Sequence, residues 1–154
     1  KPNNVIELGT FIGYSAVLIS STIEEKSKLT SIDSDIHSVE TAKELINFAG
    51  LGNKVNFVHG SAEEIIPELN INADFVFIDH AKKKYLSDLK LLETEGIIHK
   101  NCTVFADNVG IFKDEMVEYF NHVRNSGKYQ SQNFSSKLEY RNNIYDEVEI
   151  SIKN

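Results

Sequence analysis

The stretch VIELGTFIGYSAV, residues 5–17, decides the fold prediction for this chain. A short apolar run containing the carboxylate Glu7 is followed by two glycines, Gly9 and Gly13, and then by an apolar segment of helical character. A strand, a glycine turn and a helix in this order are typical of the first unit of an open parallel sheet, where such turns bind ligands. The residue types around the turn should therefore indicate which ligand it takes.

Composition limits the classes of partner. The chain has 154 residues, of which 41% are hydrophobic and 25% charged, as expected for one globular domain with a sizeable core. Acidic residues outnumber basic ones by 23 to 16, and the net charge of −7 argues against nucleic acid as a partner. No apolar run approaches the roughly 20 residues that span a bilayer. We therefore expect a small-molecule partner, no nucleic acid and no membrane, and leave the oligomeric state open.

The single cysteine and the start of the chain suggest where the protein works. Cys102 is alone, so an internal disulfide is excluded, and its apolar surroundings favour a buried hydrophobe in a reducing compartment. No signal segment opens the chain, and we predict a cytoplasmic location. The chain begins at Lys1 with the first predicted strand starting at Val5, so we expect an N-terminally truncated piece of a longer protein.

Strand-length apolar runs alternate with helical periodicities along the rest of the chain, as in a parallel sheet. Strands are predicted over residues 5–8, 29–33, 55–59, 75–79 and 103–106. Helices are predicted over residues 15–21, 36–49, 62–69, 83–92 and 114–126. Two further strands, 129–134 and 144–152, follow with no helix between them, which favours an antiparallel hairpin at the edge of the sheet. We find no linker or repeat, so one domain, 1–154, is predicted.

Acidic residues stand at the ends of four of these strands. Glu7, Asp33, Asp79 and Asp107 lie at or just after the carboxyl ends of strands one, two, four and five. Open parallel sheets bind ligands at that edge, where loops and helix N-termini converge. Each of these carboxylates is therefore a candidate ligand contact.

The first turn favours S-adenosylmethionine over NAD. A dinucleotide fingerprint has the pattern GxGxxG, whereas the sequence here is ELGTFIG, and a carboxylate at Glu7 would repel a pyrophosphate. A cationic amine suits Glu7 better, with Gly9 allowing close backbone approach. Asp33 is placed to accept hydrogen bonds from a ribose diol, which both ligands carry. Alternatively, Asp33 caps the next helix and contacts no ligand, although Asp35 is better placed for capping.

A second group of residues lies in FIDHAKKKY, residues 77–85, and FADNV, residues 105–109. Asp79, Asp107 and Asn108 offer three hard oxygen ligands without sulfur, which suits Mg²⁺ and disfavours zinc. Lys82 could reach the same site as a general base, or could simply neutralise the two carboxylates. His80 either contacts an aromatic ring of the cofactor or is a hydrogen-bonded loop histidine.

With these residues the sequence resembles the catechol O-methyltransferases. The resemblance runs through VIELGTFIGYSAV, VNFVHGSAEEIIPEL, FIDHAKKKYLSDLKLLE, VFADNV and LEYRNNIYDEVEISI, nearly the whole chain in the family's order. It implies an α/β fold: a Rossmann-like, doubly wound, mostly parallel seven-stranded sheet with an antiparallel last strand. The family also has N-terminal helices over the cofactor, which we expect to belong to the part of the protein before Lys1.

The resemblance also assigns roles to matching residues. It implies Asp79, Asp107 and Asn108 as magnesium ligands, Lys82 as catalytic base, and Glu139 as the carboxylate that holds the second catechol hydroxyl. Lys82, Asn108 and Glu139 would contact the substrate. Residues that would bind S-adenosylmethionine surround its methionine, ribose and adenine: Glu7, Gly9, Tyr14, Ser15, Asp33, Ser34, Gly60, Ser61, Ala62, Glu63, Asp79 and His80.

Three positions depart from the family. A tryptophan usually follows the histidine and a proline usually stands a few residues beyond the asparagine, whereas this chain has Ala81 and, by alignment, Phe112. Those residues wall the catechol slot in the family, so the resemblance does not fix the preferred substrate shape of this chain. Glu63 stands where a glutamine is common.

The function predicted is Mg²⁺-dependent transfer of a methyl group from S-adenosylmethionine to one hydroxyl of a catechol-like diol. One alternative is a cation-dependent O-methyltransferase acting on larger phenolic substrates. Another is a non-catalytic domain that keeps the methyltransferase fold for partner binding. An NAD-dependent dehydrogenase is the remaining alternative, which a cofactor titration would test.

Overall fold

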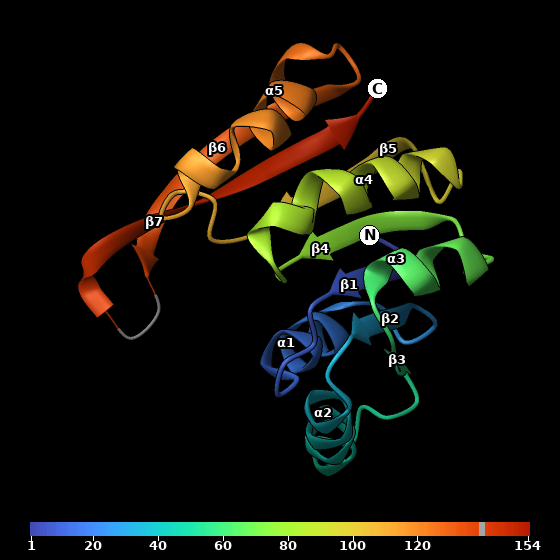
Figure 1. Cartoon of the computed structure of the whole chain (residues 1–154). Helices are drawn as coiled ribbons and strands as arrows, with labels where there is room; N and C mark the ends of the chain where they lie inside the picture. The colour runs from blue at the N-terminus through green and yellow to red at the C-terminus, as the bar shows by residue number, and fades with distance from the viewer. Residues whose placement is uncertain (139–140) are drawn as a thin grey trace.

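The computed structural model describes residues 1–138 and 141–154 as a single seven-stranded sheet with helices on both faces (Figure 1). The strands are β1 (Asn4–Leu8), β2 (Lys28–Asp33), β3 (Val55–His59), β4 (Ala73–Ile78), β5 (Ile98–Ala106), β6 (Tyr129–Leu138) and β7 (Arg141–Lys153). The helices are α1 (Tyr14–Thr22), α2 (Ile36–Phe48), α3 (Ala62–Ile65), α4 (Tyr85–Thr94) and α5 (Val117–Asn125). Short 3-10 turns cover Ile66–Glu68, Lys82–Lys84 and Lys113–Glu115.

The sheet order confirms the predicted topology. The strands follow the order β3-β2-β1-β4-β5-β7-β6, and β1 to β5 pair in parallel. Strand β7 runs antiparallel to both β5 and β6, which makes the predicted hairpin the edge of the sheet. In Figure 1 the hairpin stands at the opposite end of the sheet from β3. Because the chain reverses its order between β1 and β4, the loops after these two strands diverge and leave room for a ligand.

Alternation along β1 builds two hydrophobic cores. Val5 packs with residues of α1 and α2 on one face of the sheet, whereas Ile6 and Leu8 pack in the larger core with residues of α4 and α5. Successive side chains of a strand point to opposite faces, so a strand buried on both sides reads as a continuous apolar run. Glu7 interrupts this run with a carboxylate that is fully buried.

Several predicted boundaries shift for local reasons. The helix predicted over 62–69 is α3 followed by a 3-10 turn, because Pro67 has no N–H to continue the α-helical ladder. The helices predicted from residues 83 and 114 begin instead as 3-10 turns, and their α-helical parts start at Tyr85 and Val117. Asp35 caps α2 by accepting a hydrogen bond from the His37 N–H, as the sequence predicted.

Gly9 brings the first loop against the end of β4. Its φ of 102° lies in the region that favours glycine, and a Cβ there would stand 2.3 Å from the Asp79 carbonyl oxygen. The Asp79 N–H donates to the Leu8 carbonyl at 2.9 Å, which ties the ends of β1 and β4 together. The glycine loop and Asp79, 70 residues apart in sequence, therefore border the same space.

Candidate functional site

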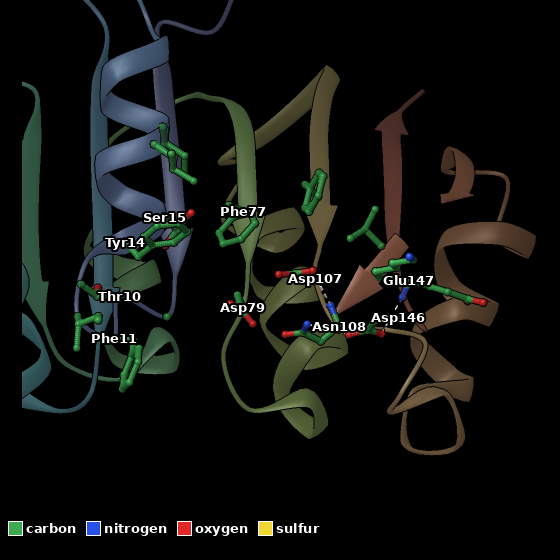
Figure 2. Close-up of a pocket in the computed structure, with 17 residues that line it drawn as sticks. Thr10, Phe11, Tyr14, Ser15, Phe77, Asp79, Asp107, Asn108, Asp146 and Glu147 are labelled. Carbon is green, nitrogen blue, oxygen red and sulfur yellow. Dashed lines mark hydrogen bonds between the residues drawn. The ribbon is translucent and has the colours of Figure 1, made fainter. Parts of the chain in front are cut away.

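Two cavities lie at the carboxyl edge of the sheet. The acidic cavity, of about 580 Å³, is the larger, and Figure 2 shows it between the glycine loop with α1 and the ends of β4, β5 and β7. It is lined by Gly9, Thr10, Phe11, Ile12, Tyr14, Ser15, Leu18, Ile19, Phe77, Asp79, Phe105, Asp107, Asn108, Lys137, Asp146, Glu147 and Val148. The smaller cavity, of about 260 Å³, is lined by Leu8, Gly9, Ile32, Asp33, Ser34, Gly60, Ser61, Ala62, Glu63, His80, Ala81, Lys84 and Asp88. Gly9 lines both.

Most of the predicted cofactor residues line these cavities. Eight of the twelve border the smaller one: Gly9, Asp33, Ser34, Gly60, Ser61, Ala62, Glu63 and His80. Tyr14, Ser15 and Asp79 border the acidic cavity instead. Glu7 borders neither.

Asp33 braces the glycine loop from the end of β2. Its Oδ2 accepts hydrogen bonds from the N–H groups of Thr10, at 2.9 Å, and Phe11, at 3.0 Å. Its Oδ1 accepts one from the Asp35 N–H at 2.9 Å. Asp33 thus holds the loop in shape while it lines the smaller cavity, a structural role that differs from the helix cap weighed from the sequence.

Glu7 lies behind the loop. Ser31 Oγ donates a hydrogen bond to Glu7 Oε2, while Oε1 is buried without a hydrogen-bond partner among the described residues. Burial raises the pKa of Glu7 to about 7, an effect that the Ser15 and Ser31 hydroxyls partly offset. A carboxyl with this pKa is partly protonated near neutrality, so the expected attraction between a charged Glu7 and a cationic amine is weaker than its position in the sequence indicates.

The loop before α3 forms one wall of the smaller cavity. Ser61 and Glu64 make a reciprocal capping box, which fixes the first turn of the helix. Glu63 reaches across to Lys84, whose Nζ lies 3.1 Å from Glu63 Oε2. This ion pair joins two lining residues, and Glu63 is one of the positions at which the sequence departs from the family.

His80 is held rigidly at the other wall. Its Nε2 lies 2.6 Å from Asp88 Oδ2, and its ring stacks on Tyr85 with the centroids 5.3 Å apart. Its Nδ1 is buried without a partner in the described part of the chain. The loop-histidine alternative is therefore partly correct, since His80 has a protein partner and also faces the cavity.

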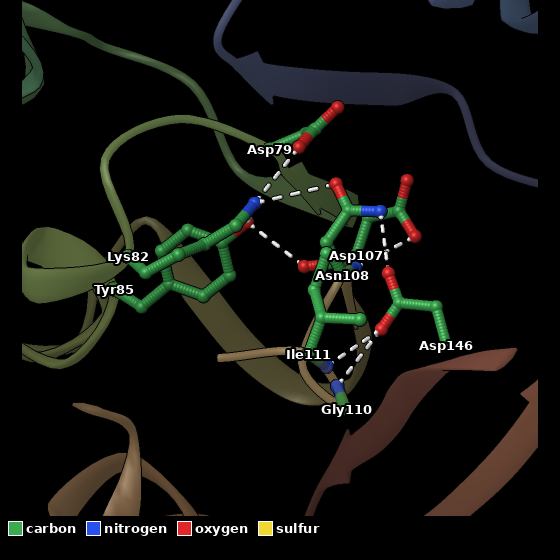
Figure 3. Close-up of polar contacts among 8 residues, drawn as sticks. All are labelled: Asp79, Lys82, Tyr85, Asp107, Asn108, Gly110, Ile111 and Asp146. Atoms are coloured by element: carbon green, nitrogen blue, oxygen red, sulfur yellow. Dashed lines mark hydrogen bonds and ion pairs between the residues drawn. The ribbon is translucent and has the colours of Figure 1, made fainter. Parts of the chain in front are cut away.

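Lys82 lies among polar groups beside the acidic cavity (Figure 3). Its Nζ donates to Asp79 Oδ1 at 3.0 Å and to the Tyr85 hydroxyl at 2.6 Å, and lies 3.5 Å from Asn108 Oδ1. The Tyr85 hydroxyl in turn donates to the Asp107 carbonyl at 3.1 Å. Burial raises the pKa of Tyr85, which keeps it a neutral hydroxyl that orients the lysine. Sequence reasoning missed this role of Tyr85.

The three expected magnesium ligands meet at this point. Asp79, Asp107 and Asn108 all line the acidic cavity, and Asp107 N–H donates to the Ile78 carbonyl at the end of β4. Burial, followed by repulsion from Asp79, raises the pKa of Asp107, although the Asn108 N–H donates to its carboxylate and Lys82 attracts it. A buried carboxylate with a second one nearby is stabilised by a cation.

These donors fit a hard divalent cation. Within residues 1–138 and 141–154, no group of three or more His, Cys, Asp and Glu side chains could hold a metal by itself. The set here is two carboxylates and one amide oxygen, which leaves other positions to water or substrate. Mg²⁺ is commonly bound in this way.

Other residues at the site were not found from the sequence. Asp146 and Glu147, both on β7, add two carboxylates to the acidic cavity, and Phe77 and Phe105 also line it, with their rings tilted by 34° and their centroids 5.5 Å apart. The only available signal was the DE pair in YDEVEI: alternation along a half-exposed strand aims one of the two side chains inward, so the pattern could indicate one carboxylate but neither both nor their roles. Glu139, the expected contact of the second hydroxyl, lies outside the described residues.

The positions that depart from the family flank the site. Ala81 lines the smaller cavity. The Phe112 ring centre lies 5.7 Å from Lys82 Nζ, and the side chain is 37% exposed. A partly exposed ring beside the lysine offers an apolar surface next to the polar groups.

Comparison with known proteins identifies the family of the chain. A family model described as O-methyltransferase matches residues 1–144. Catechol O-methyltransferase of Sus scrofa is 35% identical over 145 residues, with 91% of this chain and 77% of that protein covered. Catechol O-methyltransferase B of Danio rerio is 37% identical over 145 residues, with 91% of this chain but only 54% of that protein covered. The chain thus spans about half the length of the zebrafish relative.

Solved structures confirm the predicted fold, and the family comparison confirms the resemblance. The O-methyltransferase TomG of Streptomyces achromogenes, solved in complex with S-adenosylmethionine, matches with a TM-score of 0.89 at 18% identity, covering 99% of this chain and 74% of TomG. In the part of the chain that the structure describes, no helix is long and apolar enough to cross a membrane. The chain belongs to the O-methyltransferase family, with catechol O-methyltransferases among its relatives.

Proposed function

We propose that this chain is a single methyltransferase domain that transfers a methyl group from S-adenosylmethionine to one hydroxyl of a catechol-like diol, with Mg²⁺ as the metal. The observation that carries the proposal is the meeting of Asp79, Asp107 and Asn108 with Lys82 at the acidic cavity, which shares Gly9 with the smaller one. The pig and zebrafish relatives are named catechol O-methyltransferases. A cytoplasmic location belongs to the same proposal.

The smaller cavity suits the nucleoside of S-adenosylmethionine. Asp33 would accept hydrogen bonds from the ribose diol, while the loop 60–63 and the His80 ring would border the adenine. The glycine loop and Ser15 would hold the methionine end where the two cavities join. TomG, which has the same fold, was solved with this cofactor, which supports the assignment.

The acidic cavity suits the metal and the diol. Asp79, Asp107 and Asn108 would hold Mg²⁺. When bound there, Mg²⁺ would supply Lewis acidity and a template for both oxygens of a diol. Phe77 and Phe105 would support the aromatic ring, and Phe112 would border it beside Lys82.

Lys82 would accept the proton of the hydroxyl that is methylated. A neutral Nζ has one lone pair for this proton, and its contacts with Tyr85 and Asp79 hold it in one place. The proton that arrives at Nζ would be stabilised by Asp79. The main contribution of the remaining residues is alignment of two reactants in a fixed geometry. Glu139 as the contact of the second hydroxyl stays a prediction.

Two of the alternatives predict different substrates or none. The acidic cavity of about 580 Å³ has room for diols larger than catechol, so an O-methyltransferase for larger phenolics stays in the test. A non-catalytic domain would have no need of Lys82 within hydrogen-bond distance of Asp79.

The test is methyl transfer from labelled S-adenosylmethionine to catechol, to a bulkier catechol derivative and to phenol, with Mg²⁺ and with a chelator. We expect product from the diols only, and only with the metal. Equal rates on phenol, or in the presence of the chelator, would contradict a metal-dependent reaction of diols. No transfer to any of the three, with tight binding of NAD in a parallel titration, would instead support a dehydrogenase.

A further inference from the structure

Asp146 is a buried carboxylate that accepts hydrogen bonds from the loop after β5 and from the backbone of its neighbour Glu147 on β7. Its Oδ1 accepts from the N–H groups of Gly110 and Ile111, both at 3.0 Å, and of Glu147 at 2.7 Å. Its Oδ2 accepts from Asn108 Nδ2 at 2.9 Å. Figure 3 shows Asp146 between the Asn108 side chain and the backbone of Gly110 and Ile111. No role was assigned to this residue from the sequence.

The contact to Oδ2 fixes which way the Asn108 amide points. A carboxylate accepts hydrogen bonds and does not donate, so only the amide nitrogen of Asn108 can face it. The amide oxygen must then point the opposite way, and Asn108 Oδ1 lies 3.5 Å from Lys82 Nζ. The oxygen that is offered to a cation is thus chosen by a residue 38 positions further along the chain.

The backbone of this loop is also shaped around β7. Asn108 has a φ of 53°, a left-handed conformation that asparagine tolerates better than most residues. The Val109 N–H donates to the Glu147 carbonyl at 2.8 Å, and a Cβ on Gly110 would stand 2.8 Å from the Glu147 backbone nitrogen. The loop therefore has little freedom to present Asn108 differently.

We propose that Asp146 is a positioning residue: it locks the Asn108 amide with its oxygen toward the metal and Lys82, and so sets the affinity of the site for Mg²⁺. The inference rests on the proposed function, because it needs Asn108 to be a ligand. Residues that orient metal ligands in this way change metal affinity by roughly 10–100-fold when they are replaced. The competing explanation is that Asp146 only anchors the loop.

A single substitution separates the two explanations. Asp146→Asn keeps the size of the side chain, and its remaining oxygen can still accept from the backbone of the loop. Its new NH₂ group, however, would face the NH₂ group of Asn108. Two donors cannot hydrogen-bond to each other, so one of the two side-chain amides must turn. If Asn108 turns, it presents NH₂ to the cation, and affinity falls.

The measurement is direct titration of the protein with Mg²⁺, or with Mn²⁺ followed by electron paramagnetic resonance, without substrate. We expect Asp146→Asn to weaken metal binding by roughly 10–100-fold while the affinity for S-adenosylmethionine stays unchanged. The matched control is Glu149→Gln, which also replaces a buried carboxylate of β7 by an amide. Glu149 pairs with Arg124 instead of with the loop after β5. The control substitution should lower the melting temperature and leave metal affinity unaltered.

The double variant Asn108→Asp with Asp146→Asn completes the test. It exchanges donor and acceptor between the two positions, so a carboxylate oxygen again faces the metal and the hydrogen bond between the positions is kept. We expect metal affinity to recover to within about tenfold of the wild type or better. Unaltered metal affinity in Asp146→Asn overturns the inference, as does failure of the double variant to recover it. A wild-type protein that binds neither cation overturns the proposed metal site itself.

Discussion

The two cavities at the carboxyl edge of the sheet are built in different ways. The smaller cavity is bordered by residues between Leu8 and Asp88, mostly from the loops that follow β1, β2, β3 and β4. The acidic cavity brings together the glycine loop and α1 with side chains at the ends of β4, β5 and β7, so its lining runs from Gly9 to Val148. The smaller cavity is therefore a feature of successive βα turns. The acidic cavity, in contrast, forms only when the β6–β7 hairpin pairs with β5.

Their charges differ as well. Asp79, Asp107, Asp146 and Glu147 line the acidic cavity, against Lys137 on its wall and Lys82 beside Asp79. In the smaller cavity, Glu63 pairs with Lys84, Asp88 is hydrogen-bonded to His80, and Asp33 accepts three backbone hydrogen bonds. An excess of carboxylates calls for a cation, whereas a wall whose carboxylates already have protein partners suits a ligand held by hydrogen bonds.

The largest effect is expected for Asp107→Ala. Loss of this ligand should lower kcat for catechol methylation by about 10³-fold or more, since a bound metal supplies several kcal/mol of catalysis. Affinity for S-adenosylmethionine should be retained, because Asp107 faces the acidic cavity alone. Turnover and cofactor affinity are measured on the same preparation. Equal loss of both would mean that the two cavities do not act separately.

Lys82→Met should slow the chemical step by roughly 10²–10⁴-fold, measured as single-turnover methylation of catechol. Lys82→Arg should be nearly as damaging, because a guanidinium stays protonated and cannot accept the proton. If Lys82 merely neutralises Asp79, arginine keeps the charge and most of the activity. An active Lys82→Arg enzyme would therefore remove the base assignment.

Glu7→Gln should make stability less dependent on pH. The folded pKa of about 7 lies above the ordinary value of 4.5, so folded protein keeps a proton that the unfolded chain releases. Stability of the wild type should thus fall as pH rises from 4.5 to 7, by up to about 3 kcal/mol, and level off above. Glutamine does not ionise, so the free energy of unfolding of the variant should rise relative to that of the wild type as the pH increases from 4.5 to 7. Denaturant unfolding at pH 5 and pH 8 measures it, and a constant difference would contradict a buried, protonated Glu7.

Asp33→Ala should weaken binding of S-adenosylmethionine by about 1–3 kcal/mol through lost charge-assisted hydrogen bonds. Part of this loss would come from the glycine loop, which Asp33 holds through the Thr10 and Phe11 N–H groups. Asp35→Ala is the control, because Asp35 caps α2 and lines neither cavity. Calorimetric titration measures all three proteins, and an Asp35→Ala variant as weak as Asp33→Ala would assign the effect to the helix.

The same division explains what the sequence could predict. The glycine turn, the acidic strand ends and the hairpin follow from local patterns, so the fold and the positions of Asp33 and Asp79 were predictable. Tyr85 and Asp146 were not, because their roles depend on hydrogen bonds to Lys82 and Asn108 that only tertiary structure creates. For Glu7, the sequence showed a carboxylate at a strand end but not that the side chain is fully buried, and it is this burial that raises its pKa.

The most direct test of the two-cavity account is to titrate S-adenosylmethionine and Mg²⁺ separately into Asp33→Ala and Asp107→Ala by calorimetry. If the two cavities bind separate ligands, we expect opposite outcomes: Asp33→Ala loses affinity for S-adenosylmethionine and keeps its affinity for Mg²⁺, whereas Asp107→Ala loses affinity for Mg²⁺ and keeps its affinity for S-adenosylmethionine. Thermal unfolding of both variants shows whether the sheet is intact. Loss of both ligands together in either folded variant would contradict the account.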